Sequence, residues 1–211
     1  MSDYYHNTRF TQDPRRTVLW KALWRFYFKN LITADDTVLD LGCGYGNFIH
    51  QVKAKKRIAV DCWPGFIQHI EPGIQTIVAN IADLSAVENA SVDFAFASNV
   101  FEHMSQEELA VTLAELRKKM SSRGQLTILQ PNYRYCAPEY FDDYTHISIW
   151  SHISLSDFLM ANGYEVTKVE PRFLPLTIQS RFPVHPCLIA LYLMSPFKPF
   201  AKQMLLMARP R

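Results

Sequence analysis

Short apolar runs alternate with helical stretches through the middle of the chain, and this alternation constrains the fold more than any other feature. The β-like runs are Thr37–Leu41, Arg57–Val60, Gln75–Val78, Val92–Ala97 and Gln125–Leu129. A strongly amphipathic helix, Ser105–Met120, separates the last two. Such alternation predicts an α/β fold, in which a parallel sheet carries helices on both faces.

The remaining segments complete one domain, for which 211 residues are ample. Helices are predicted over Pro14–Leu31, with Asp13 as its N-cap, from about Asn47, and over Ser154–Ala161. Late strands are predicted at Tyr164–Val169 and Gln203–Ala208. We therefore expect an N-terminal helical cap (1–36), a core (37–174), an apolar and basic insert (175–200) and a last strand (201–211).

A glycine-rich turn follows the first predicted strand, in the sequence Val38-Leu39-Asp40-Leu41-Gly42-Cys43-Gly44-Tyr45-Gly46. Glycines at such a turn let the backbone approach a ligand where any Cβ would clash. On its own the pattern is also compatible with a tight connection that binds nothing.

Polar residues follow the next three strands as well: Asp61 the second, Asn80 the third, and Ser98 with Asn99 the fourth. Open α/β sheets bind ligands at the carboxyl ends of their strands, so these residues are expected to meet one nucleoside. Asp61 would accept from both ribose hydroxyls, and Asn80 from the adenine amino group. The spacing G-x-G-x-G differs from the nicotinamide fingerprint and favours a methionine-bearing nucleoside over a pyrophosphate.

These four motifs, in this order, resemble the class I S-adenosylmethionine-dependent methyltransferases of the broad type 11 family. The resemblance implies a Rossmann-like, seven-stranded, mostly parallel sheet of order 3-2-1-4-5-7-6, with strand seven antiparallel. It also implies S-adenosyl-L-methionine as cofactor.

Carried over by position, the resemblance assigns cofactor contacts to particular residues. Asp40, Gly42, Cys43 and Gly44 would surround the methionine part, and Asp61 would bind the ribose. Asn80 and Ile81 would bind the adenine, with Cys62 or Trp63 over its face. Ser98 and Asn99 would complete the cofactor site.

Methyl transfer needs two reactants held in line, and a base helps when the acceptor is a hydroxyl. His103, after the fourth strand, and His146, in the loop after the fifth, are the predicted catalytic residues, with His152 a weaker candidate. Asp142 or Asp143 would orient His146. The alternatives are helix capping or packing for His103, together with Glu102, and a solvated loop for His146.

The spacing of His103, Asp142, Asp143 and His146 matches no strong metal pattern, so no metal site is expected. The preferred reaction is O-methylation of a small acceptor such as a saccharide or glycan precursor. This preference rests on a general similarity to methyltransferases of bacterial surface-polysaccharide pathways. N- or C-methylation of another metabolite, and a cofactor-binding partner protein without turnover, are the alternatives.

Composition narrows the possible partners. A net charge of +2 gives no reason to expect nucleic-acid binding. Four widely spaced cysteines and the lack of an apolar leader favour a cytoplasmic protein with reduced thiols. The aromatic N-terminal segment (Tyr4, Tyr5, Phe10, Trp20, Trp24) is expected to lie mostly in the core, with a cover over the cofactor as the alternative role. Arg9 is a candidate ion-pair partner for the cofactor carboxylate.

The insert is the other unusual segment. From Lys168 onward the chain holds seven basic residues and one acidic residue, and Cys187–Met194 is apolar almost all round. The insert therefore either packs on the sheet edge, forms a homodimer, or contacts an anionic membrane through Arg181, Lys198 and Lys202.

Overall fold

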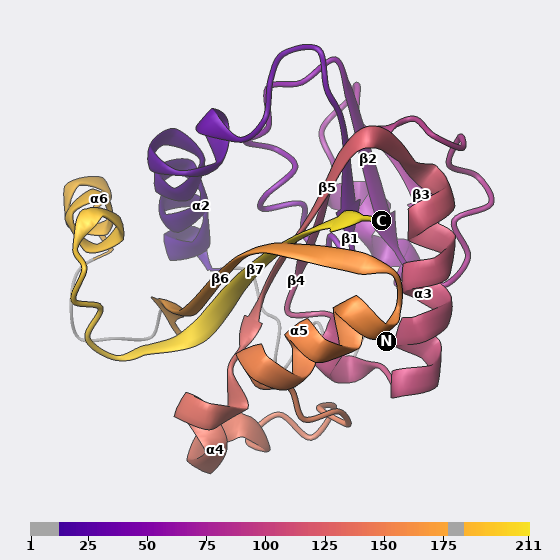
Figure 1. The fold of residues 1–211 in the computed structure, drawn as a ribbon. Helices are drawn as coiled ribbons and strands as arrows, with labels where there is room; N and C mark the ends of the chain where they lie inside the picture. The colour runs from indigo at the N-terminus through magenta and orange to yellow at the C-terminus, as the bar shows by residue number, and fades with distance from the viewer. Residues whose placement is uncertain (1–12, 177–183) are drawn as a thin grey trace.

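A seven-stranded sheet of order β3-β2-β1-β4-β5-β7-β6 forms the centre of the computed structural model (Figure 1), which describes residues 13–176 and 184–211. The strands are β1 (Thr37–Leu41), β2 (Lys56–Asp61), β3 (Gln75–Val78), β4 (Val92–Ser98), β5 (Met120–Pro131), β6 (Tyr164–Pro175) and β7 (Ala201–Pro210). β1 to β5 pair in parallel, and β7 runs antiparallel to both β5 and β6. The predicted fold class, strand order and antiparallel last strand are confirmed.

Helices cover both faces of this sheet. They are α2 (Pro14–Phe26), α3 (Gln106–Lys119), α4 (Tyr133–Tyr140), α5 (His152–Ala161) and α6 (Pro186–Met194), with 3-10 turns η1 (Phe28–Asn30), η2 (Pro64–His69) and η3 (Phe101–His103). Side-chain oxygens begin several of them: Asp13 caps α2, and Ser105 forms a capping box with Glu108 on α3. Such caps satisfy amide groups that have no partner inside the helix.

Two hydrophobic clusters divide the core between the faces. On one face α3 and α5 pack leucines such as Leu113 and Leu159 on the sheet. On the other, α2 and η1 contribute Leu23 and Phe28, against which α6 adds the partly buried Tyr192 and Leu193. Figure 1 shows the same division, with α3 and α5 on one side of the strands and α2 and α6 on the other.

Several predicted boundaries need correction. α2 ends at Phe26 rather than Leu31, and the chain continues as a 3-10 turn. No regular helix begins near Asn47: the segment after the glycine turn makes single turns, such as the bond from the His50 N–H to the Gly46 carbonyl. A segment this short gains few helical hydrogen bonds against the cost of nucleation. α4 was not predicted, because Pro138 inside it indicates a break.

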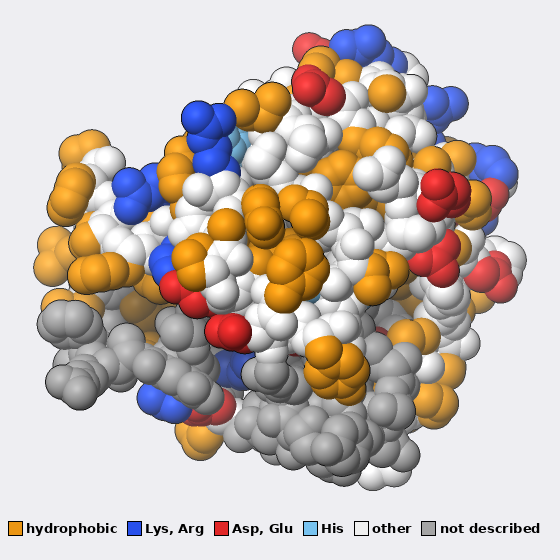
Figure 2. Space-filling model, turned by 90° about the horizontal axis from the view of Figure 1, so that it is seen from below, with side chains coloured by type: hydrophobic (Ala, Val, Ile, Leu, Met, Phe, Trp, Pro, Cys, Tyr) orange, Lys and Arg blue, Asp and Glu red, His pale blue; other side chains and the backbone are white. Residues whose placement is uncertain are grey.

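The insert buries its apolar residues only in part, since Tyr192 and Leu193 pack against the core while other apolar residues of α6 are exposed. No residue of α6 is buried, and Leu188, Leu191 and Met194 are exposed. Phe197 and Phe200, which follow α6, are each 74 % exposed. Figure 2 shows hydrophobic side chains along the edge of the molecule where α6 lies. Within residues 13–176 and 184–211, no helix has the length and apolar character that crossing a bilayer requires.

Candidate active site

The glycine turn after β1 has the backbone that the sequence predicts. Gly42, Gly44 and Gly46 all have positive φ, between 52° and 70°. A Cβ on Gly42 would lie 2.6 Å from Val100, which follows β4. The turn therefore requires glycine, and it brings the end of β1 against the end of β4.

Asp61 joins this turn to the end of β2. Its carboxylate accepts hydrogen bonds from the Gly44 N–H, at 2.8 Å, and from the Trp63 N–H, at 2.9 Å. A carboxylate can accept up to four hydrogen bonds, so the two ribose hydroxyls can still be accommodated. Asp61 is thus fixed in place before any ligand binds.

Asp40 lies beside Asp61 and is 4 % exposed. Burial, and then the neighbouring Asp61 charge, raise the pKa of Asp40 well above its ordinary value. The direction follows from the cost of holding two carboxylates in a poorly hydrated site. A cationic ligand group, such as an ammonium or a sulfonium, offsets this cost.

A small cleft of about 40 Å³ connects the turn to the end of β4. Its lining contains five predicted cofactor residues and five others: Asp40, Gly42, Cys43, Ser98 and Asn99, with Arg16, Trp20, Asn47, Phe48 and Phe96. This volume is far smaller than the roughly 300 Å³ or more of a typical small-molecule pocket, so the cleft can hold only part of a nucleoside cofactor. Arg16 was not predicted from the sequence. Trp20 was expected to be mostly core, with a cover for the cofactor as the alternative, and its ring both lines the cleft and packs on Phe48.

Asn99 has a left-handed backbone, with φ of 54°. Its side chain donates to Ser98 Oγ at 3.3 Å and accepts from Gln203 Nε2 of β7 at 3.3 Å. Left-handed non-glycine residues are uncommon and concentrate at functional sites. This backbone supports the predicted role of Asn99 at the cofactor edge.

The other predicted cofactor residues lie after β2 and β3 and outside the lining of this cleft. Asn80 is exposed, and its Oδ1 accepts from the Ala82 N–H at 3.0 Å. Ile81 and Trp63 are buried, whereas Cys62 is exposed. Since β1, β2 and β3 are parallel, their carboxyl ends form one edge, which extends from the glycine turn to Asn80.

The two predicted catalytic histidines lie together in the structure, although they are far apart along the chain. Their ring centroids are 4.9 Å apart. His103 lies on η3, directly after β4, and His146 comes from the loop between α4 and α5. Neither Tyr140 nor Thr145, which hold these rings, was identified from the sequence.

Backbone and hydroxyl groups orient both rings. His146 Nδ1 donates to the Tyr140 carbonyl at 2.6 Å, so a backbone group supplies the orienting bond that an aspartate was expected to make. His103 Nδ1 lies 2.9 Å from Thr145 Oγ1, and that hydroxyl donates to Asp143 at 2.6 Å. Asp143 therefore acts on His103 through Thr145. His152, the weaker candidate, bonds Asn132 and stacks on Tyr135 instead.

Glu102 points into the same cluster and was treated from the sequence only as a helix cap or packing residue. It is fully buried, and burial raises the pKa of its carboxyl to about 8. Burial, followed by the charge of His146, lowers the pKa of His103 to about 4. Burial also lowers the pKa of His146. At neutral pH both imidazoles are therefore neutral.

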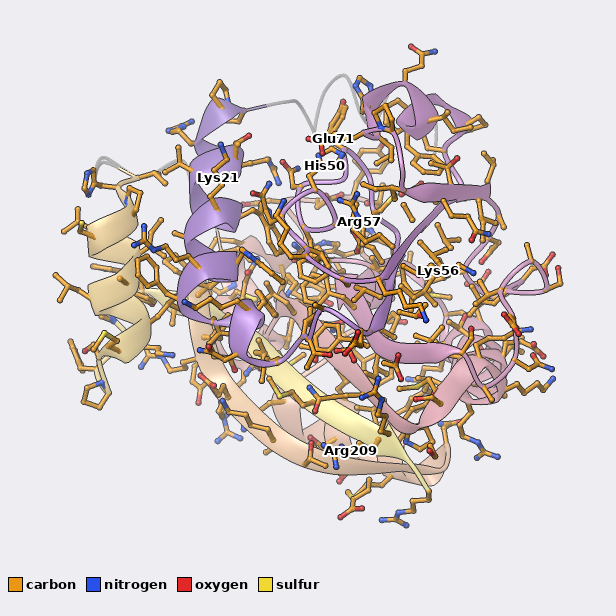
Figure 3. The ribbon with its side chains drawn as sticks, turned by 90° about the horizontal axis from the view of Figure 1, so that it is seen from above. Lys21, His50, Lys56, Arg57, Glu71 and Arg209 are labelled. Atoms are coloured by element: carbon orange, nitrogen blue, oxygen red, sulfur yellow. The ribbon has the colours of Figure 1, made fainter. Side chains whose placement is uncertain are left out.

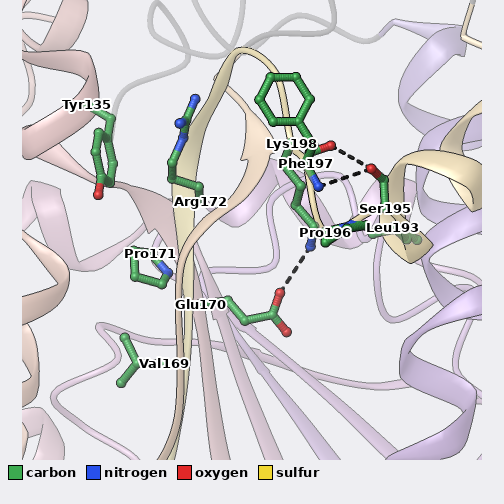
Figure 4. A pocket seen from close by; sticks show the side chains of 10 residues that line it. All are labelled: Tyr135, Val169, Glu170, Pro171, Arg172, Leu193, Ser195, Pro196, Phe197 and Lys198. Carbon is green, nitrogen blue, oxygen red and sulfur yellow. Dashed lines mark hydrogen bonds and ion pairs between the residues drawn. The ribbon is translucent and has the colours of Figure 1, made fainter.

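A second cavity, of about 500 Å³, lies between the end of β6 and the segment after α6 (Figure 4). Tyr135, Glu170, Arg172 and Lys198 line it together with apolar residues. The Lys198 ammonium is 3.1 Å from a Glu170 carboxylate oxygen. Because β6 runs parallel to β5, this cavity lies at the same carboxyl edge of the sheet as the cofactor cleft.

Tyr4, Tyr5, Arg9, Phe10 and Arg181 lie outside the described residues. Their expected roles at the cofactor and at the insert stay predictions.

Comparison with known proteins gives one family-model match and one similar relative. A family model described as a methyltransferase domain matches residues 39–128, which run from β1 to β5. An uncharacterized protein of Methanocaldococcus jannaschii is 27 % identical over 171 residues, which are 81 % of this chain and 72 % of that protein.

Solved structures share the fold across almost the whole chain. A S-adenosylmethionine-dependent methyltransferase from Archaeoglobus fulgidus superposes with a TM-score of 0.70, at 21 % identity, and covers 98 % of this chain and 99 % of its own. The geranyl diphosphate C-methyltransferase of Streptomyces coelicolor has a TM-score of 0.63, at 14 % identity, covering 90 % of this chain and 77 % of its own. The chain thus matches the methyltransferase domain over residues 39–128 and shares the fold and sheet order of solved S-adenosylmethionine-dependent methyltransferases.

Proposed function

We propose that this chain is an S-adenosylmethionine-dependent methyltransferase that transfers the methyl group to a hydroxyl of a small acceptor, with a saccharide or glycan precursor as the preferred class. The observation that carries the proposal is the pair His103 and His146, held together directly after β4. Neutral imidazoles are the side chains most often used to take a proton from a hydroxyl. The cavity beside Tyr135 and Arg172 offers an aromatic face and charged groups to a polyhydroxylated acceptor.

The cofactor roles follow from the edge described above. Asp40, Gly42, Cys43 and Gly44 surround the methionine part, and Ser98 with Asn99 close its other side. Asp61 binds the ribose, and Asn80, Ile81 and the Cys62–Trp63 segment bind the adenine. The sulfonium and the ammonium of the donor suit the buried Asp40 and Asp61 carboxylates.

Cofactor binding gives the first test. S-adenosylhomocysteine and S-adenosylmethionine are expected to bind, and NAD is not. Asp61→Ala should weaken S-adenosylhomocysteine binding by about 1.5–3 kcal/mol, because hydrogen bonds to a charged group contribute on this scale. Isothermal calorimetry measures the affinity directly.

Asp83→Ala is the matched control, since Asp83 is an exposed aspartate on the loop after β3. It should bind the cofactor as the unmodified chain does. Asp61 also holds two backbone N–H groups, so thermal unfolding of each variant must show that it is folded. Unchanged affinity in a folded Asp61→Ala variant would remove Asp61 from the ribose site.

Product analysis tests the reaction itself. With methyl-labelled S-adenosylmethionine, label on an ether oxygen supports O-methylation. Label on nitrogen or carbon supports the alternative acceptors, and cofactor binding without any labelled product supports a non-catalytic partner protein.

The exposed face of α6 supports a proposal about partners. We propose that a second copy of the chain covers Leu188, Leu191 and Met194. Lys198 and Lys202 are paired with Glu170 and Glu139, which leaves less positive charge for an anionic membrane than the sequence indicated. Each buried leucine-sized side chain contributes about 1.5–3 kcal/mol to such an association.

Self-association is expected to be lost in Leu191→Glu. Sedimentation should show a dimer for the unmodified chain and a monomer for this variant, whereas Val111→Glu, on the exposed side of α3, should stay dimeric. A monomer that floats with anionic vesicles would support the membrane alternative instead. A monomer that floats with no vesicle would show that the insert makes only local contacts.

A further inference from the structure

Three side chains that commonly ligate metals converge directly after β4. Glu102 and His103 come from η3, and His146 comes from the loop before α5. One donor atom of each lies within 4.8 Å of the others, and Glu102 Oε1 is 4.0 Å from His146 Nε2. Atoms this close share a point no more than about 2.8 Å from all three. Shifts of about 1 Å or less would reach the ordinary 2.0–2.2 Å of nitrogen and oxygen ligands.

The buried carboxyl group of Glu102 is the feature that indicates a cation at this cluster. It is 0 % exposed, and within the described part of the chain neither carboxylate oxygen has a hydrogen-bond partner. Buried carboxylates are normally paired, hydrogen-bonded or bound to a metal, because an unpartnered polar group is costly to bury. A bound cation would satisfy both oxygens at once.

The two histidines are held as metal ligands usually are. The Tyr140 carbonyl can only accept, so His146 carries its proton on Nδ1 and its Nε2, the atom near Glu102, has a lone pair. Thr145 Oγ1 donates to Asp143 and therefore accepts from His103 Nδ1. Ligating histidines typically donate their other N–H to a carbonyl, hydroxyl or carboxylate, which fixes the tautomer and the ring.

We propose that Glu102, His103 and His146 bind one divalent transition-metal ion, such as Zn²⁺. Two imidazoles and one carboxylate suit Zn²⁺, Fe²⁺ or Co²⁺, whereas Mg²⁺ and Ca²⁺ prefer oxygen ligands. Three protein ligands leave at least one coordination position open. This set of ligands differs from the one that was rejected on sequence spacing. Glu102 replaces Asp142 and Asp143 as the carboxylate ligand, and both histidines are kept.

The ion would serve the acceptor, and this consequence rests on the proposed O-methylation. An acceptor hydroxyl bound at the open position loses its proton to water more readily, because the cation stabilises the oxyanion. That oxygen then attacks the methyl carbon: the C–O bond forms, the C–S bond breaks, and the electron pair stays on sulfur. With the ion bound, the histidines position the acceptor through the metal rather than take its proton.

Direct metal binding tests the proposal without any need for the acceptor. The chain is dialysed against a chelator and titrated with Zn²⁺ by calorimetry and with Co²⁺ by absorption. One equivalent of each should bind, with weak visible Co²⁺ bands typical of nitrogen and oxygen ligands. Glu102→Gln and His146→Gln should each weaken binding by about 100-fold or more, since loss of an outer-shell partner alone costs 10–100-fold.

His50→Gln is the matched control. His50 lies beside Glu71 and Arg57 on the loop after the glycine turn (Figure 3), and its Nε2 accepts from the Glu71 N–H at 3.4 Å. This variant should bind the ion as the unmodified chain does. Thermal unfolding of the metal-free variants checks that each is folded, and having two ligand variants keeps the test decisive if one of them does not fold.

Two results would overturn the proposal: no saturable Zn²⁺ or Co²⁺ binding to the unmodified chain, or binding that the folded ligand variants retain. A thiolate charge-transfer band would place the ion on a cysteine and would also overturn it. S-adenosylhomocysteine binding by the metal-free chain is measured in parallel. A chain that does not bind S-adenosylhomocysteine would count against the proposed function. A chain that binds S-adenosylhomocysteine but no metal would count only against the metal site.

Discussion

Methyl transfer is expected to slow by about 10²–10⁴-fold when the histidine that acts on the acceptor, His103 or His146, is replaced by alanine. The rings lie together after β4, and each is oriented through Nδ1, so that Nε2 is the nitrogen that would face an acceptor or a bound ion. S-adenosylhomocysteine affinity should stay nearly unchanged, because neither ring lines the cofactor cleft. Single-turnover rates with labelled cofactor, and the acceptor found by product analysis, measure the effect.

His185→Ala is the control for this experiment. His185 is exposed and caps α6, on the insert, so its replacement should leave the rate unchanged. If His103→Ala and His146→Ala both react at the unmodified rate, the enzyme works by holding the two reactants in line and uses neither a base nor a metal at this position.

The second large effect concerns stability. Phe28→Ala should lower the free energy of unfolding by about 3–5 kcal/mol, the usual cost of deleting a fully buried phenylalanine ring. Phe28 is 0 % exposed, and its ring contacts those of Phe48 and Phe96 at centroid distances of 5.3 Å. It also packs on Trp20, which lines the cofactor cleft, so the variant should bind S-adenosylhomocysteine more weakly.

Urea denaturation measures this change, and Phe26→Ala is its control. Phe26 ends α2, two residues before Phe28, but is 37 % exposed, so its removal should cost about 0.5 kcal/mol or less. A Phe28→Ala variant that loses less than about 1 kcal/mol would show that the N-terminal helix is not anchored through this ring.

The parallel strands and their order could be predicted because their signals are local or carried by the resemblance. β3 matches its predicted bounds, and β1 does as well, since each is a short apolar run bounded by polar or glycine residues. β5 and β6 extend well beyond the predicted runs. Their added residues, such as Ser121 and Arg123, have little strand propensity and are held by pairing and by Asp93.

The two sides of the site differ in how well sequence predicts them. The cofactor side follows a rule of sheets, since polar residues at carboxyl strand ends meet at one edge. The acceptor side depends on how a loop folds back. The loop that carries His146 is held against η3 by contacts such as the bonds from the Ile147 and Ser148 N–H groups to the Glu102 carbonyl, and no periodicity in the sequence reports such a contact.

The position of β7 has a consequence for how the nascent chain folds. β7 follows β6 along the chain, yet in the sheet it lies between β5 and β6. Until residues 201–210 have left the ribosome, β5 therefore presents an unpaired edge, and β6 has no strand to join. Open edges of this kind invite pairing with other chains, so newly made protein should depend on chaperones until β7 inserts.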